Sequence, residues 1–495
     1  MFGVDVVITP ATPLARTREF NKGCIIGKCT GYTGDKFIEE VTDLSTLSSA
    51  GISSTKQLYK SVQWFLEGVS SAGGNNIGVT VAVYDAFSGE TVEKESVLES
   101  WDSSTYEYNL QTSPVESVDA VYLKIGTAFV AQPTEAWTAE QDDSGLYTGK
   151  IVFSAVGGNE TPWSPDGSSY MTNDDVSSGK YDVNGVHVDY TLSRFQSLLD
   201  ELLEKDVNFI VLSHDCTTSG MAAANTFTRQ SLLHDYMSMK LHCSAAASKG
   251  TPRQFIAALP AGVQPSASDA GFGLSQPRTF SDWKSLLGSQ DVTLIAHRVA
   301  TDDGEAMADP AAFMMGRVVS KTTLKQGFVL DDWTNFPQVE YYSAGDEKAW
   351  ESAQVCVVTH MPNFFSGNLL TTGFTLGSGT AARIENVRCK YYIQNRLKAA
   401  LLTLVASKQV YINKAGCLRI KSVIEGVIES ARIRGVCDGL NEIVFPLLDA
   451  FRNPSEQSSQ ALISEAKSTR SIGPIEVRYN WSGNPEYITV IMTEV

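Results

Sequence analysis

Apolar residues near the start of the chain alternate between strand-like and helix-like spacing. Residues 23–27 form a short apolar run bounded by glycines, which predicts a strand. Leu58, Val62 and Phe65 recur at helical spacing up to Gly68, so we expect a helix there with Thr55 as its N-cap. Residues 79–84 then alternate as a strand. Together these predict a strand, helix, strand module over residues 21–85.

Residues 86–186 have a different composition, rich in Ser, Thr, Asp and Gly and broken by turns. Short strand patterns stand at residues 120–125 and 149–153. We interpret this stretch as an inserted, exposed, all-β domain.

Helical and strand patterns alternate again over residues 187–382. They predict, in order, a helix at 192–203, a strand at 207–212, a helix at 222–247, a strand at 254–259, a helix at 281–287 and a strand at 292–296. Three helix and strand repeats indicate a largely parallel, helix-covered sheet, so the fold class is α/β with α+β parts.

The stretch 383–480 is predicted to be a mainly helical module. Apolar stripes run along residues 393–405 and 420–428, and residues 455–467 supply a shorter helix. Residues 475–479 are expected to form a two-stranded end with the strand that follows the turn formers at 482–485.

Both ends of the chain carry strand patterns, in an N-terminal arm (1–20) and a C-terminal strand arm (481–495). Apolar residues alternate at Val4, Val6 and Ile8 before Pro10, and their counterparts near the C-terminus are Ile488, Val490 and Met492. Each strand could pair within its own subunit or complete the sheet of a neighbour, and the pattern leaves both open.

Composition places the chain among multidomain globular proteins. Its 495 residues exceed what one core holds, and 43% hydrophobic and 19% charged residues are ordinary values. No apolar run approaches the roughly 18 residues that a membrane span needs, and no leader pattern opens the chain, so we expect cytosolic synthesis without membrane insertion. The eight scattered cysteines fit reduced core thiols.

The net charge of −17 is unevenly distributed. Residues from 383 onward hold 15 Lys and Arg against 11 Asp and Glu, whereas residues 1–382 hold 24 against 45. An ordinary solvated helix face explains any single charge, while a protein partner with an acidic wall is the better functional interpretation. The basic positions cluster at Arg383, Arg388, Lys390, Arg396, Lys398, Lys408 and Lys414.

Candidate catalytic or ligand-binding chemistry is sparse. The glycines of residues 23–28 lack the spacing of a phosphate-binding loop, and apolar residues fill the loop. His214, Cys216, His234, His242 and Cys243 recur within thirty residues, but at no known zinc spacing. For residues 23–28, a strand that ends in a turn is the simpler interpretation. For His214 and its neighbours, solvated polar residues at a strand end are the simpler interpretation.

A hydrolase remains a second hypothesis. Ser213, His214 and Asp215 follow a predicted parallel strand, and His297 follows another, which is where α/β enzymes place catalytic groups. However, no Gly-x-Ser-x-Gly motif is present to form a nucleophile elbow. A third hypothesis is a monomeric surface-binding protein that uses residues 86–186.

The order of three segments resembles that of contractile tail sheath proteins, found in tailed viruses and related injection systems. The first segment comprises residues 22–34, the polar stretch 41–43 and the helix at 57–68. The second is residues 308–317, in which a small-residue run ends at Gly316. The third is the C-terminal module with its strands at 473–477 and 488–492. The resemblance covers about two thirds of the chain. Residues 86–186 have no counterpart in it, which is consistent with the variable outer insertions of that family.

The resemblance implies a structural subunit that polymerises around an inner tube and contracts, without catalytic residues, cofactor or metal. It implies a homo-oligomer of stacked rings, contacts with inner tube, baseplate and tail terminator proteins, no direct contact with nucleic acid, and a place in a virion tail assembled in the host cytoplasm. The terminal arms would complete small sheets in adjacent subunits. Arg383, Arg388, Lys390, Arg396 and Lys398 would face the tube.

Overall fold

The computed structural model describes residues 21–480 with internal gaps. The gaps are residues 75, 88–90, 103–105, 112–114, 142–146, 155–157, 215–226, 228–231, 262, 266–279, 299–307, 322–327, 329–330, 338, 341, 361–366 and 408–409. The predicted arm positions Val4, Val6, Ile8, Ile488, Val490 and Met492 therefore lie outside the described residues, as do Asp215 and Cys216.

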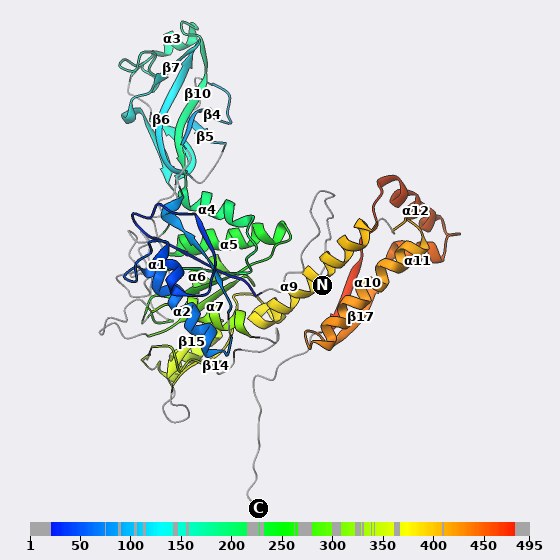
Figure 1. The fold of residues 1–495 in the computed structure, drawn as a ribbon. Helices are drawn as coiled ribbons and strands as arrows, with labels where there is room; N and C mark the ends of the chain where they lie inside the picture. Colours follow the sequence, from blue (N-terminus) through cyan, green and yellow to red (C-terminus); the bar gives the residue numbers. More distant parts are fainter. Residues whose placement is uncertain are drawn as a thin grey trace, which may run out of the picture.

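A mixed sheet of nine strands forms the centre of the body, which comprises residues 21–87 and 194–382 (Figure 1). In spatial order its strands are β14 (Asp331–Asp332), β16 (Asn368–Leu370), β15 (Cys356–His360), β13 (Val292–Ala296), β12 (Gln254–Ala258), β11 (Phe209–Leu212), β1 (Gly23–Gly27), β3 (Val79–Val83) and β2 (Phe37–Val41). The six strands from β15 to β3 run parallel, and the other three pair antiparallel at the two edges. The predicted α/β class is confirmed, with antiparallel edges added.

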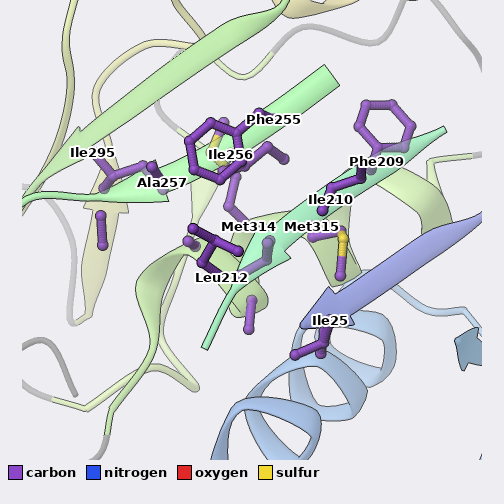
Figure 2. Close-up of a cluster of buried hydrophobic side chains, with 14 of the residues drawn as sticks. Ile25, Phe209, Ile210, Leu212, Phe255, Ile256, Ala257, Ile295, Met314 and Met315 are labelled. Carbon is purple, nitrogen blue, oxygen red and sulfur yellow. The ribbon is translucent and has the colours of Figure 1, made fainter. Parts of the chain in front are cut away.

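The parallel strands lie in the interior because helices cover them. Every residue of β1, β11, β12 and β13 is buried, as expected where a sheet is enclosed on both faces. Figure 2 shows Met314 and Met315 of helix α7 (Pro310–Ser320) among Ile25, Leu212 and other strand residues. Because β1 pairs with both β11 and β3, the stretches 21–85 and 187–382 share one sheet and one core.

Helix α7 is buried along its entire length and crosses α2 (Gln57–Ser71). The crossing is close because each helix has a glycine at the contact. A Cβ atom at Gly316 would collide with the backbone of Phe65 and Val69, and one at Gly68 would collide with the Phe313 carbonyl. The small-residue run that ends at Gly316 therefore has a packing function: it lets two backbones touch.

Further helices complete the body. They are α1 (Leu44–Ser49), α4 (Arg194–Leu203), α5 (Leu232–Ser248), α6 (Phe280–Leu287) and α8 (Ala344–Ser352), with 3-10 turns η1 (Tyr84–Ala86) and η4 (Gly379–Ala382). Among the described residues, no helix combines the length and the apolar composition needed to span a bilayer.

An antiparallel sheet of seven strands forms a second module, which projects from the body in Figure 1. Its elements are β4 (Thr91–Ser96), β5 (Glu107–Asn109), β6 (Val115–Ile125), β7 (Ala128–Ala131), η2 (Thr134–Ala136), β8 (Trp137–Gln141), β9 (Tyr147–Phe153), α3 (Asn173–Ser177) and β10 (Val183–Leu192). It has its own core, in which the buried Trp163 ring packs against Phe153 and Tyr108 at centroid distances of 4.1 and 5.7 Å. Strand β10 continues past the predicted boundary at 186, up to the start of α4.

The C-terminal module has a third core. Its elements are α9 (Ile384–Ala406), α10 (Lys414–Ile433), β17 (Gly439–Val444), α11 (Pro446–Arg452), α12 (Gln457–Thr469) and β18 (Glu476–Asn480). Helices α9 and α10 lie side by side, and β17 packs on α10 (Figure 1).

Several local predictions need correction. Helix α2 begins at Gln57 with Lys56 as N-cap, which makes no side-chain capping bond, so Thr55 is not the cap. Phe227 lies in a bend inside the helix predicted for residues 222–247, and α5 starts at Leu232. Strand β18 pairs with β17, an element that the sequence did not predict. The terminal strand that was expected beside β18 lies outside the described residues.

The α2–α7 crossing predicts opposite effects for two helical glycines. Gly316→Ala forces the backbones apart and should lower the free energy of unfolding by about 1–3 kcal/mol or more. Gly426→Ala in α10, where a Cβ would meet no atom within 4 Å, should raise it by up to about 1 kcal/mol. Urea unfolding followed by circular dichroism measures both, and equal effects would contradict the close crossing.

Candidate assembly surface

Helix α9 connects two hydrophobic cores. Val387 and Tyr391 in its first half are buried in the core of the body, whereas Ile393 and Leu397 in its second half belong to the core of the C-terminal module. The basic residues predicted to face a tube lie on this helix or at its start. Their surroundings therefore decide which of them are accessible to a partner.

Arg388 does not face a partner. Its side chain is 0% exposed, and its guanidinium carbon lies 5.9 Å from the centre of the Phe209 ring. Within the described part of the chain, none of its three guanidinium nitrogens has a hydrogen-bond partner. Burial lowers the pKa of Arg388 to about 10. The prediction for Arg388 fails because helical position alone does not reveal that the first half of α9 enters the body.

Lys390 and Tyr391 attach α9 to the start of β13. Lys390 Nζ donates to Gln290 Oε1 at 2.9 Å, and Gln290 Nε2 donates to the Tyr391 hydroxyl at 3.0 Å. The Tyr391 hydroxyl in turn donates to the carboxylate of Asp291, which is buried. Burial raises the pKa of Asp291 from 3.8 to about 6, although Tyr391 and Lys390 oppose the shift. Lys390 is therefore half-buried in a polar contact between the body and α9.

Three other predicted basic residues are half-buried. The Arg383 guanidinium stacks 4.1 Å from the centre of the Phe374 ring, and that of Arg396 lies 5.2 Å from the Tyr392 ring. Lys398 lies next to Gly250 of the body. Of these three, Arg396 lines the space between α9 and α10 and the other two do not. The five residues therefore do not form a single basic face.

A groove of about 620 Å³ lies between α9 and α10. Its walls combine small and apolar side chains with two arginines. The lining residues are Tyr392, Arg396, Ala399, Ala400, Thr403, Leu404 and Ser407 from α9, and Val423, Gly426, Val427, Ser430 and Arg434 from α10. In the part of the chain that the structure describes, no carboxylate lines it. The apolar stripes of the two helices did not predict this groove, although small residues such as Ala400, Gly426 and Ser430 recur on the facing sides.

Within residues 21–480, the two-stranded sheet β17–β18 has open edges. Each strand pairs only with the other among the described strands. Arg478 forms ion pairs with Glu442 of β17 at 2.8 Å and with Glu476 at 2.9 Å. Such an open edge exposes unpaired backbone groups to which another strand can add.

The proposed hydrolase residues lie in a buried polar network. Ser213 and His214 are 6% and 4% exposed. The Ser61 hydroxyl contacts the Ser213 hydroxyl at 2.7 Å and donates to Asp309 at 2.6 Å, which ties α2, β11 and α7 together. His214 Nε2 lies 3.4 Å from the Asp235 carboxylate. Burial leaves these groups no access to a substrate, and their hydrogen bonds give them a structural role.

The remaining candidate residues also have structural surroundings. His297 is fully buried and its Nε2 contacts the Leu259 carbonyl at 2.8 Å, while His242 accepts from Arg253 at 2.8 Å. In the described ranges, no three His, Cys, Asp or Glu side chains are grouped as a metal site. Residues 23–27 form β1, whose backbone is paired on both sides, so no amides remain to cradle a phosphate.

The structures to which this chain is similar include a sheath tail protein and a baseplate chain. The sheath tail protein from Desulfitobacterium hafniense is similar at 11% identity over 89% of this chain and 92% of its own, with a TM-score of 0.44. A chain of the anti-feeding prophage baseplate is similar at 10% identity over 99% of this chain and 97% of its own, with a TM-score of 0.49. No protein-family model and no curated protein matches the sequence.

The buried position of Arg388 makes a stability prediction. Replacing a buried charge that has no hydrogen-bond partner in the described chain by an apolar side chain of similar length removes its desolvation cost, so Arg388→Met should raise the free energy of unfolding by about 1–4 kcal/mol. The matched control is Arg452→Met at an exposed position of α11, which should change the free energy of unfolding by less than about 0.5 kcal/mol. Thermal or urea unfolding measures both. No change in Arg388→Met would indicate that the side chain is solvated.

The raised pKa of Asp291 predicts how stability changes with pH. Above pH 6 the folded chain must hold an ionised, buried carboxylate, and this penalty disappears as the pH falls towards 4. Asp291→Asn removes the charge and keeps an oxygen that accepts from Tyr391. We expect the variant to be more stable than the parent by up to about 3 kcal/mol at pH 8 and equal to it near pH 4.

Urea unfolding from pH 4 to pH 8 measures this difference. Taking the difference between the two proteins cancels the opposite contribution of the buried His297, whose pKa burial lowers to about 4. A constant difference across the range would show that Asp291 does not titrate as proposed.

Proposed function

We propose that the chain is a structural subunit of a contractile tail sheath, which polymerises around an inner tube and contracts to drive the tube through a target envelope. The observation that carries this proposal is the open-edged β17–β18 sheet, on a C-terminal module with its own core, in a chain whose two ends both have strand patterns. The order of sequence segments that resembles sheath proteins supports it.

A two-stranded sheet has little stability of its own and benefits from added strands. In the proposed assembly, the strand at Val4, Val6 and Ile8 of one subunit adds to an open edge of β17–β18 in another. Main-chain hydrogen bonds hold such a connection while the linked bodies rotate, which a contracting array requires. The arm residues Ile488, Val490 and Met492 form the second connection between subunits.

The remaining partners follow from this role. An inner tube protein would contact the C-terminal module near Arg396, while Arg383, Lys390 and Lys398 lie closer to the body. Baseplate and tail terminator proteins would bind the two ends of the stack, and the protein would reside in a virion tail or a related injection device. The buried Ser213 and His214 support a non-enzymatic role.

Deletion of residues 486–495 should abolish polymerisation and leave the subunit folded. None of the three cores includes a residue beyond Tyr479 in the described chain, so the truncated chain should keep its melting temperature within a few degrees. Negative-stain microscopy and size-exclusion chromatography should show monomers or short oligomers in place of tubes.

A substitution variant separates the role of the apolar face from that of chain length. Ile488→Ser with Val490→Ser and Met492→Ser should have the same effect as the deletion, whereas Thr489→Ser with Thr493→Ser on the other face should assemble normally. Tubes of normal length from the deleted chain would overturn the proposed role of the C-terminal arm.

A further inference from the structure

The outward face of the seven-stranded module carries an aromatic cluster, formed by Tyr122 of β6, Phe129 of β7 and His187 of β10. The ring centres of Phe129 and His187 lie 5.0 Å apart, and those of Phe129 and Tyr122 lie 6.5 Å apart. Phe129 is 38% exposed, and the other two rings are half-buried. Val121 and Val188, which point to the opposite face of the sheet, are buried in the core of the module. The aromatic cluster therefore faces solvent.

The aromatic cluster lies in the half of the module that is farther from the body. Strand β10 ends at Leu192, directly before α4 of the body, while at its other end Val183 pairs with Ile125. Ile125 also pairs with Ala128 at the start of β7. Figure 1 places β7 near the outer end of the module. A molecule outside the body can therefore reach the cluster.

The backbone beside the cluster is held in an uncommon conformation. Lys94 has a φ of 50°, in the left-handed region that residues other than glycine rarely adopt. Its amide donates to Asp189 Oδ1 at 2.6 Å, and the Tyr122 hydroxyl donates to Asp189 Oδ2 at 2.7 Å. The register between β4 and β10 shifts at this point, as in a β-bulge.

This conformation places the Lys94 ammonium 5.4 Å from the centre of the Tyr122 ring and 5.6 Å from that of Phe129. Bulges and strained residues of this kind occur where a side chain must be aimed at a ligand or a partner. Lys94 and Asp189 therefore belong to the same arrangement as the rings.

The charges around the aromatic cluster balance. Lys94 and Lys124 place ammonium groups over its rings, while Asp189 and Glu93 are negative neighbours of its tyrosine. Burial lowers the pKa of His187 below its usual range, so this ring is neutral at pH 7. A nucleic acid or another polyanion would meet as much repulsion as attraction here. The balance favours an uncharged ligand.

Hydroxyl and carboxylate groups continue from the cluster along the same face. Thr191 Oγ1 donates to Asp119 Oδ2 at 3.0 Å, and Ser117 Oγ donates to Asp119 Oδ1 at 2.7 Å. Each of these carboxylate oxygens has a second lone pair that can accept from a ligand hydroxyl. From His187 to Thr191 the row covers about 13 Å at 3.3 Å per residue. It is therefore longer than one sugar ring.

A sugar matches this face better than a protein partner does. Stable protein interfaces bury about 800 Å² on each partner around an apolar core, whereas this cluster has three rings with lysines between them. The faces of a pyranose ring carry C–H groups, which the negative faces of aromatic rings attract. Its edges carry hydroxyl groups, which need donors and acceptors such as those beside the cluster.

We propose that the aromatic cluster, with Lys94 and Asp189, is a binding site for an uncharged polysaccharide. One sugar ring packs on Phe129 and Tyr122, and its hydroxyl groups bond to Lys94 and Asp189. The next sugar lies along the row that ends at Thr191. An ammonium over an exposed ring is held weakly, so the lysine side chains can turn aside to admit the sugar. This binding activity is additional to assembly and does not depend on the proposed function.

A glycan array tests the class of ligand with the full-length chain. The array carries neutral glycans, glycans with uronic acids, phosphorylated glycans and single-stranded DNA. We expect the chain to bind neutral glycans most strongly. Binding to none of these probes, or stronger binding to the acidic glycans or to DNA, would overturn the proposal.

Two exposed aromatic residues of the same module provide a variant and its control. Phe129→Ala should weaken binding to the best neutral glycan about tenfold, because the sugar loses the ring on which it packs. Tyr106 is 36% exposed and lies outside the cluster, so Tyr106→Ala should change the affinity by less than about twofold. Biolayer interferometry measures both affinities, and melting temperatures verify that both variants fold. Equal losses in the two variants would exclude the cluster as the site.

Lys94→Gly separates the function of this residue from its effect on folding. Glycine adopts a positive φ without strain, so the variant should melt at a higher temperature than the parent. It also lacks the ammonium group that bonds to the sugar, so its affinity for the same glycan should fall about threefold. An unchanged or higher affinity would contradict a role for Lys94 in the site.

Discussion

The arrangement of the molecule depends on one helix that belongs to two cores. Helix α9 has 23 residues, or about 34 Å at 1.5 Å per residue. Its first half is fixed by burial in the body, and because a helix is stiff, this fixes the direction of its second half, on which α10 and the β17–β18 sheet are built. The groove and the open sheet edges are therefore held at a defined place relative to the body, although they belong to a separate core.

The contact between α9 and the body contains charges that weaken it. Arg388 is buried without a hydrogen-bond partner in the described chain, and Asp291 is buried with a raised pKa. The apolar packing of Val387 and Tyr391 must exceed these costs to hold the helix. The α2–α7 crossing carries no such charge at its glycine contacts.

The sequence predicted what local patterns determine and missed what tertiary contacts determine. The strands β1, β12 and β13 were identified because they are continuous apolar runs bounded by turn formers. Strand β17 was missed because Asn441 and Glu442 interrupt its short apolar pattern, and its identity as a strand depends on β18. Arg388 was assigned to the surface because a basic side chain on a helix is usually solvated, and only the packing of α9 against Phe209 shows otherwise. The groove required knowledge of how α9 and α10 pack.

Strand addition at the edges of β17–β18 would have a mechanical consequence in the proposed assembly. A strand added there is held by backbone hydrogen bonds, whose number depends on the length of the strand and little on its side chains. Such a connection keeps its hydrogen bonds while the bodies that it links rotate. An array linked in this way could change its packing without separating into subunits.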